Sequence, residues 1–289
     1  MALAVPSGAG AGAGPGPNAG MGAVRGIAHR RSRWSLVYSE FSYWMLRYRR
    51  TWRSSVVMGF VNPLLFFAGI GIGLGRIIDR NPAAPQPGGS YLAFLAPGLL
   101  AAAAMQTAAI ESAFAAYRSL RMQRNYRTSA AGPLEPVDIL NGHLLFVVFR
   151  VGTAAGTFFL VGACADLYRS PWALLAPFAA LLTGLAFAAP FLAWGVFVTK
   201  RSSIGNLYRF LVMPLYLFSG TYAAVGQFPE AIRILAYAAP LWHGVQLCRG
   251  LTLGTLTPAA AALHVGYLVA VAASGYVLAR AAYARGLHD

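Results

Sequence analysis

Long apolar runs separated by short polar connections make up most of the chain. Six runs each approach the ~20 residues that a helix needs to cross a bilayer at ~1.5 Å per residue. They lie near residues 56–75, 92–117, 139–165, 172–198, 207–224 and 258–280. The pattern predicts an all-α integral membrane protein with six transmembrane helices in one domain, residues 31–289. Residues 1–30, rich in Ala and Gly, predict a disordered tail.

Residues 31–53, before the first run, have a helical pattern of their own. Apolar side chains recur there at steps of three and four: Trp34, Val37, Phe41, Trp44, Tyr48 and Trp52. Arginines crowd the end of the segment, at positions 47, 49, 50 and 53. An aromatic face beside arginines is typical of a helix that lies in the membrane interface, so we expect an interfacial amphipathic helix here.

Residues 228–252, before the last run, are apolar but interrupted. Pro229 and Pro240 break the segment, and Arg233 and Arg249 lie within it. These interruptions disfavour a full span and predict two short helices that form a re-entrant hairpin. Such a hairpin must be buried in protein or line a cavity.

The basic residues are distributed unevenly between the two sides of this topology. The chain has 23 basic and 8 acidic residues, a net charge of +15. With both termini cytosolic, 17 basic residues fall on cytosolic segments, five fall on the other side and Arg150 lies within a span. This asymmetry follows the positive-inside rule. It explains the charge without a nucleic-acid partner, and none is expected.

Composition and motifs disfavour an enzyme. Only 11% of the residues are charged, against about a quarter in soluble domains. Lys200, the single lysine, follows Val-Thr rather than the glycine of a phosphate-binding loop. The alternating glycines from Gly69 to Gly75 lack a dinucleotide-binding context and suggest close helix contact or local unwinding. No catalytic, cofactor or metal site is therefore expected in this chain.

The two cysteines, Cys164 and Cys248, exclude a disulfide framework. The sequence is compatible both with a single bridge between them and with two unpaired thiols.

Glu111 and Arg150 are charged residues at membrane depth, in the second and third spans. An unpaired charge there costs at least ~2.5–3.5 kcal/mol. Adjacent antiparallel spans bring such positions together, so we predict an ion pair. The alternative is that each side chain reaches separately toward the membrane surface.

The loop after the second span has arginines at every third position, followed by a helix stop. The basic residues are Arg118, Arg121, Arg124 and Arg127, and Gly132-Pro133 ends any helix. Leu120, Met122 and Tyr126 add an apolar component. Such a segment contacts either anionic lipid or a cytosolic partner, and composition alone does not choose.

Three groups of segments resemble the permease subunits of type-2 ABC exporters, in the nodulation-protein-J-like branch. The first runs from Tyr91–Gly98 through Glu111–Arg118 to Pro133–Gly142, and the second is Met213–Tyr222. The third combines Phe228-Pro229, Ala239–Gly244 and Arg249-Gly250. The long tail departs from the family pattern, as does the Phe-Pro pair, which the family usually has directly after Ser-Gly.

The resemblance implies an exporter of a lipo-oligosaccharide, glycolipid or similar amphiphile in the bacterial inner membrane. It implies a homodimer that engages two copies of a separate ATPase, which binds the ATP and Mg²⁺. Membrane lipid is the other expected partner. The first, second and fifth spans would line the dimer interface and the transport route.

The resemblance also suggests roles for particular residues. The basic loop would dock on the ATPase through Arg118, Arg121, Arg124, Arg127 and Pro133. The hairpin would form an external gate at Phe228, Pro229, Pro240 and Trp242. Three aromatic residues would line the pathway, or belong to the interfacial aromatic belt instead: Tyr216, Phe218 and Tyr222.

Two other transport functions stay open. Related permeases export drugs or antibiotics, so efflux is the first alternative. A proton-driven secondary transporter is the second, but it would need several ionisable groups near the midplane, where the sequence offers only Glu111 and Arg150.

Overall fold

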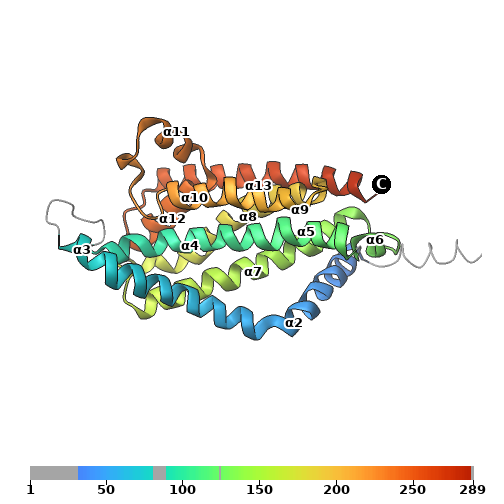
Figure 1. The fold of residues 1–289 in the computed structure, drawn as a ribbon, viewed down its shortest axis with the longest axis horizontal. Helices are drawn as coiled ribbons and strands as arrows, with labels where there is room; N and C mark the ends of the chain where they lie inside the picture. Colours follow the sequence, from blue (N-terminus) through green and yellow to red (C-terminus); the bar gives the residue numbers. More distant parts are fainter. Residues whose placement is uncertain (1–31, 81–88, 124, 288–289) are drawn as a thin grey trace, which may run out of the picture.

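The structure is a computed structural model that describes residues 32–80, 89–123 and 125–287. Every regular element in these ranges is a helix (Figure 1). The predicted tail, residues 1–30, lies outside the described residues.

The helices join into a few long runs, whose bounds are as follows. The first run is α2 (Arg33–Phe66), η1 (Phe67–Gly75) and α3 (Arg76–Asp79). The second is α4 (Tyr91–Ala109), η2 (Ile110–Phe114), α5 (Ala115–Tyr117) and η3 (Arg118–Met122), followed by the separate α6 (Asn125–Ala130). Next come α7 (Pro136–Cys164), η4 (Pro171–Leu175) with α8 (Ala176–Phe197), and α9 (Arg201–Leu207) with η5 (Tyr208–Val212) and α10 (Met213–Phe218). The chain ends with η6 (Val225–Gln227), α11 (Glu230–Ala238), α12 (Pro240–Leu253) and α13 (Pro258–Gly286).

Five of these runs are long and apolar enough to cross a membrane. They are Arg33–Asp79, Tyr91–Met122, Pro136–Cys164, Pro171–Phe197 and Pro258–Gly286. The predicted fifth span corresponds to the run from α9 to α10, which is shorter and carries Arg201, Asn206 and Arg209. Integral membrane architecture is therefore supported, and the predicted fifth span, near residues 207–224, stays a prediction.

The interfacial helix and the first span are one continuous helix rather than two elements. Residues 33–79 are helical throughout, and α2 bends along its length (Figure 1). The predicted aromatic stripe is divided, because α7 covers part of it. The Trp44 ring is buried and stacks on the His143 ring at 4.2 Å between centroids, whereas the Trp34 side chain is exposed.

Glycine allows α2 to approach α7 so closely. A Cβ atom at Gly142 of α7 would lie 2.5 Å from Cβ of Glu40 and 2.8 Å from the Val37 carbonyl oxygen. Only a residue without a side chain fits there, as at close helix contacts within membranes. Periodicity alone does not distinguish this protein-facing surface from a lipid-facing one.

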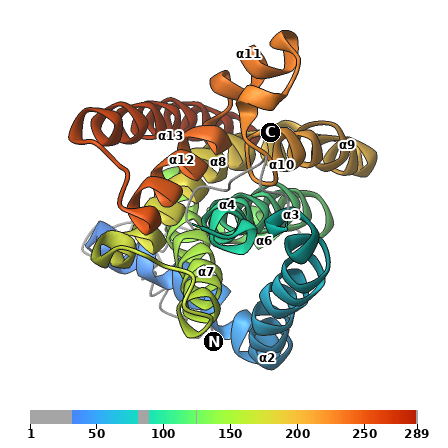
Figure 2. The ribbon, with the colours of Figure 1, turned by 90° about the vertical axis from the view of Figure 1, so that its left-hand side faces the viewer.

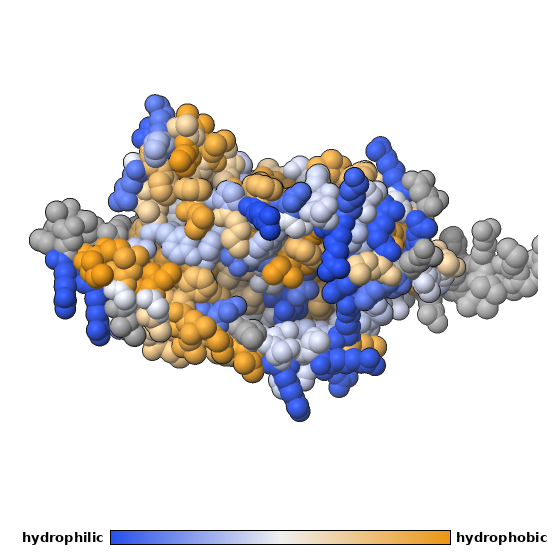
Figure 3. Space-filling view, viewed as in Figure 1, coloured by the Kyte–Doolittle hydropathy of each residue, from blue (hydrophilic) through white to orange (hydrophobic). Residues whose placement is uncertain are grey.

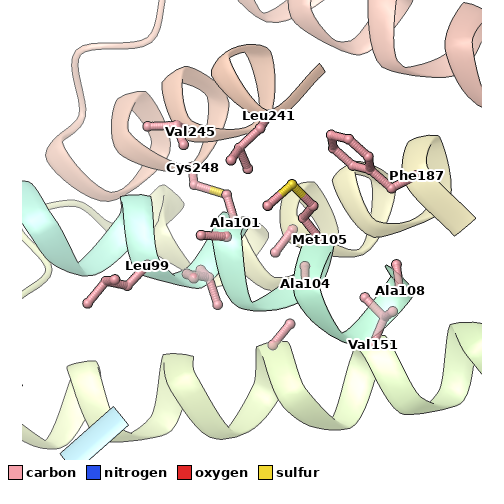
Figure 4. Close-up of a cluster of buried hydrophobic side chains, with 14 of the residues drawn as sticks. Leu99, Ala101, Ala104, Met105, Ala108, Val151, Phe187, Leu241, Val245 and Cys248 are labelled. Carbon is pink, nitrogen blue, oxygen red and sulfur yellow. The ribbon is translucent and has the colours of Figure 1, made fainter. Parts of the chain in front are cut away.

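The core lies where α4, α7, α8 and α12 meet (Figure 4). Leu99 and Met105 of α4 pack with Val151 of α7, Phe187 of α8 and Leu241 of α12. Small residues bring these helices together, since a Cβ atom at Gly184 of α8 would lie 2.5 Å from Cγ1 of Val151. The long helix α13 packs along α8 on the far side of this core.

The predicted pair of short helices before the last run corresponds to α11 and α12, which meet at Ala239. The inner face of α12 is buried against α4 and α8. In contrast, α11 projects from the bundle in both ribbon views and exposes Ile234 and Leu235 (Figures 1 and 2). The membrane re-entry of this pair stays a prediction.

The alternating glycines form the wide π-helical turns of η1. A Cβ atom at Gly69 or Gly73 would meet nothing within 4 Å, so neither glycine makes a close contact with another described helix. The local change of winding agrees with the second of the two interpretations of this motif.

One end of the bundle is basic. It carries α5, α6, the start of α9 and the end of α13 (Figure 1). We call it the basic end and define it by Arg47, Arg118, Arg121, Arg127 and Lys200. Hydrophilic side chains project there, whereas the surface of α2 toward α3 is mostly apolar (Figure 3).

Candidate functional site

The basic loop combines an exposed charged face with a buried apolar one. Arg118, Arg121, Arg127 and Pro133 are exposed, and Arg124 lies outside the described residues. Leu120 and Tyr126 are fully buried. The first part of the loop is the continuation of the second span to Met122, and only α6 is a separate short helix.

A hydrogen-bonded cluster anchors α6 to two long helices. The Tyr126 hydroxyl contacts Nδ1 of His143 in α7 and lies 3.2 Å from the Tyr283 hydroxyl in α13. The other ring nitrogen of His143, Nε2, is 2.8 Å from the Glu111 carbonyl oxygen. Because a carbonyl only accepts, Nε2 carries the proton and Nδ1 accepts from Tyr126. We call Tyr126, His143 and Tyr283 the anchor cluster.

The start of α2 is also joined to this loop. Nη1 of Arg47 donates to Oε1 of Gln123 at 2.8 Å. The buried Glu40 carboxylate accepts from Nε1 of Trp44 at 3.1 Å and from Oγ of Ser129 at 3.3 Å. A shallow cavity of about 400 Å³ between α2 and the loop is lined by Tyr43, Leu46, Arg47, Arg50 and Gln123. The basic end therefore presents arginines beside apolar side chains.

The two charges predicted to pair are in contact. Nε of Arg150 in α7 lies 2.9 Å from Oε1 of Glu111 in η2, and each side chain is about one-fifth exposed, at 18% and 20%. The Tyr48 ring of α2 covers the guanidinium, with Cζ of Arg150 4.8 Å from the ring centroid. Glu111 lies in a π-helical turn, a feature often found at functional sites.

Arg150 also borders a cavity of about 440 Å³ between α2, α4 and α7, the three helices that surround this region in the end-on view (Figure 2). We call it the polar cavity, because many hydroxyl and amide side chains line it. They are Ser54, Ser55, Asn62, Gln106, Thr107, Thr153 and Thr157. Nothing in the sequence pattern revealed this cavity, since the helices contribute only a few polar residues each.

The predicted pathway aromatics do not share one surface. Tyr216 lines the polar cavity, and its ring lies 5.3 Å from that of Tyr222 between centroids. The Phe218 ring instead packs against Phe228, at 5.8 Å. Phe218 and Tyr222 are not among the residues that line the polar cavity.

The predicted gate residues belong to the α11–α12 pair. Pro229 precedes α11, and Pro240 is the first residue of α12. The Trp242 ring packs edge-on against Tyr237, with centroids 4.8 Å apart.

Arg249 of α12 is a buried cation that the sequence analysis placed merely outside the spans. Its Nη2 donates to the Gly220 carbonyl at 2.8 Å and its Nε to the Phe94 carbonyl at 3.3 Å. No carboxylate pairs with Arg249 among the described residues. A basic residue within an apolar segment was the signal available in the sequence.

The described residues hold neither a metal-binding cluster nor a disulfide bridge. In the described part of the chain, no three His, Cys, Asp or Glu residues gather as a metal site. Cys164 and Cys248 are both free, which removes the alternative of a bridge between them.

Residues 36–253 match the family described as ABC-2 type transporter, so the chain belongs to that family. Among curated proteins it is similar to nodulation protein J of Rhizobium leguminosarum bv. viciae, 30% identical over 237 residues that cover 78% of this chain and 87% of the relative. Nodulation protein J of Bradyrhizobium diazoefficiens is 30% identical over 245 residues, 84% of this chain and 90% of the relative. Nodulation protein J of Rhizobium meliloti is 27% identical over 246 residues, which cover 84% of this chain and 90% of the relative.

These matches confirm the resemblance to nodulation-protein-J-like permeases. The chain is an integral membrane subunit of an ABC transporter, and permeases of this family generally work with a separate ABC ATPase subunit.

Proposed function

We propose that this permease exports a lipo-oligosaccharide, glycolipid or similar amphiphile from the bacterial cytoplasm. It works as a homodimer in the inner membrane, with two copies of an ATPase that binds ATP and Mg²⁺, and it has no catalytic role itself. The observation that carries the coupling is the loop at the basic end, which exposes its arginines and is anchored to α7 and α13 through Tyr126. The similarity to nodulation protein J supports the substrate class.

The basic end faces the cytosol in this proposal. Arg47, Arg118, Arg121, Arg127 and Lys200 gather there, as the positive-inside rule requires of cytosolic segments. The α11–α12 pair lies at the opposite end and closes the external side.

The exposed arginines and the shallow cavity beside them fit the ATPase subunit. Arg121 and Arg127 offer charge to acidic side chains, and the exposed Leu46 and Met122 offer apolar contact. A buried apolar centre with a charged rim is the usual anatomy of a specific interface.

Movement of the loop has two rigid routes into the membrane domain. The anchor cluster passes a displacement of α6 to α7 and α13. The run Tyr91–Met122 is continuous, so a push at η3 also reaches Glu111 and the far end of α4. There Arg249 joins α4 to α12, which carries the movement to the external hairpin.

A double variant, Arg121→Glu with Arg127→Glu, tests the coupling. We expect it to insert normally, to lose co-purification with the ATPase and to lose ATP-driven export from proteoliposomes. The matched control is Arg76→Glu, because Arg76 is exposed at the opposite end of the bundle. This change should leave co-purification and export unchanged. A Gly/Ser replacement of the whole loop is unsuitable, because Leu120 and Tyr126 belong to the core.

Full export by the double variant would contradict the coupling role, and export without any ATPase would contradict the proposed function. A panel of glycolipids and hydrophobic drugs in the same assay separates the proposed substrate from drug efflux. Proton-driven transport is less well supported, because Arg150 already engages the Glu111 carboxylate.

A further inference from the structure

The polar cavity has no part in the coupling described above. We propose that it binds the head group of the exported amphiphile, and that the Glu111–Arg150 pair makes it selective for uncharged head groups rich in hydroxyls and amides. This inference rests on the proposed function and adds a site and a basis for selectivity.

The size of the cavity suits a head group. Its volume of about 440 Å³ falls in the range of small-molecule sites, about 300–1,000 Å³. The neighbouring outer surface of α2 is apolar, with Val57, Leu64 and Leu65 each more than half exposed. A hydrocarbon chain attached to a head group in the cavity can therefore lie along α2 in the lipid.

The lining offers both donors and acceptors of hydrogen bonds. The Thr153 and Thr157 hydroxyls donate within α7, to the carbonyls of Arg150 and Thr153, each at 2.8 Å. Each hydroxyl oxygen also has lone pairs that can accept a hydrogen bond. The amides of Asn62 and Gln106 both donate and accept. Hydroxyl and amide groups of a ligand, which also do both, match this lining.

The charge of the cavity is balanced. Arg150 is the one charged residue among those that line it, and Glu111 at 2.9 Å neutralises it. Because Glu111 already neutralises the Arg150 guanidinium, an anionic head group gains little net attraction there and is repelled by the nearby carboxylate. A cationic head group meets the opposite penalty. An uncharged head group leaves the pair intact.

The Tyr48 ring supports this arrangement. It lies over the Arg150 guanidinium while Glu111 holds Nε, so two neighbours restrict the side chain. A guanidinium held in this way is less free to turn toward an anion in the cavity.

Photocrosslinking of the permease in nanodiscs, without ATPase, tests the proposal. The probe is an alkyl maltoside with a diazirine beside the sugar, and its competitors are a maltoside, a phosphate and a trimethylammonium with the same alkyl chain. We expect labelling of residues 54–62, 103–110 and 150–158, with competition mainly by the maltoside. Labelling elsewhere, or equal competition by all three amphiphiles, would overturn the proposal.

Charge variants then test the selectivity. Glu111→Gln should make the alkyl phosphate compete roughly tenfold better, and Arg150→Gln should do the same for the trimethylammonium. The double variant should return to the wild-type preference. A preference unaltered in both single variants would contradict the role of the pair.

A variant that keeps both charges guards against misfolding. Asn62→Leu with Thr157→Val should reduce maltoside labelling severalfold without changing the preference between charges, and unchanged labelling would count against the lining. Because these measurements need no ATPase, their failure alongside intact ATP-driven export rejects the cavity alone. Labelling as expected with no export in the presence of ATPase rejects the proposed function instead.

Discussion

Arg249 lies over the face of Phe94, with its guanidinium carbon 3.8 Å from the ring centroid. The contact joins α12 to α4 at the end opposite the basic loop. The same guanidinium donates to the carbonyls of Phe94 and Gly220, so one side chain connects three separate segments of the chain. The planar, forked donor set of arginine suits this role better than a lysine ammonium.

Arg249→Lys is therefore expected to lower the free energy of unfolding by about 1–3 kcal/mol, because the Gly220 carbonyl loses its partner in a buried site. Denaturation in mixed micelles, followed by helical circular dichroism, measures the effect. Arg233→Lys is the control, since Arg233 is more exposed and lies 3.9 Å from Glu230. Equal stability of the two variants would show that Arg249 does not hold these segments together.

Two glycines of α7 should respond in opposite ways to alanine. At Gly142 the new Cβ meets Glu40 at 2.5 Å, so α2 must shift, at a cost of about 1–3 kcal/mol. At Gly152 a Cβ meets nothing within 4 Å, and the better helix propensity of alanine should make the variant neutral or more stable by about 0.5–1 kcal/mol. Thermal unfolding of both proteins in one detergent compares them directly. A harmless Gly142→Ala would contradict the close packing of α2 on α7.

The hydrogen bonds of the anchor cluster predict that removing the Tyr126 hydroxyl destabilises the protein more than removing the Tyr283 hydroxyl. Tyr126→Phe leaves Nδ1 of His143 without its donor in a buried site, so we expect the free energy of unfolding to fall by about 1–3 kcal/mol. Tyr283→Phe removes one hydroxyl contact and strands no histidine nitrogen, so it should cost about 1 kcal/mol. Chemical denaturation gives the two values, and the reverse order would reject the assigned hydrogen-bond directions.

The dependence of stability on alkaline pH gives a separate test of the burial of Tyr126. Burial raises the pKa of Tyr126 well above its usual range, so the folded protein keeps the phenol protonated after the unfolded chain has lost its proton. The stabilising contribution is therefore complete below about pH 10 and declines as the pH rises further. Tyr126→Phe should lose less stability per pH unit above that point than the wild type. Parallel slopes would mean that Tyr126 ionises freely in the folded state.

The Glu111–Arg150 contact should appear as a coupling energy between the two residues. In a cycle of Glu111→Gln, Arg150→Gln and the double change, we expect the double variant to be milder than the sum of the singles by about 0.5–3 kcal/mol. The matched control is Arg33 with Glu135, a pair at 3.5 Å whose side chains are 78% and 58% exposed. Its coupling should lie near 0–1 kcal/mol. Similar coupling in both cycles would mean that the burial of Glu111 and Arg150 adds nothing.

The features predictable from the sequence were those that depend on local pattern. Uninterrupted apolar runs located the long helices, and two opposite charges at similar depth in neighbouring spans located the contact of Glu111 with Arg150. Pro240 and its neighbours marked the start of α12.

Features that depend on which helices become neighbours were missed. The stripe containing Trp44 has the same spacing whether it faces lipid or α7. Its burial against α7 depends on Gly142, which has no side chain to keep the two helices apart. The polar cavity gathers residues as distant as Ser54 and Thr157. Arg249 finds its partners in backbone carbonyls, which carry no sequence signal.

The unbroken first helix has a geometric consequence. Its 47 residues would extend about 70 Å if straight, well beyond the ~40–45 Å thickness of a membrane with its head groups. Such a rod must either stand out into water or turn along the surface. The bend in α2 turns the first part of the run away from the direction of the rest, which is the shape that an interfacial helix continuous with a span requires (Figure 1).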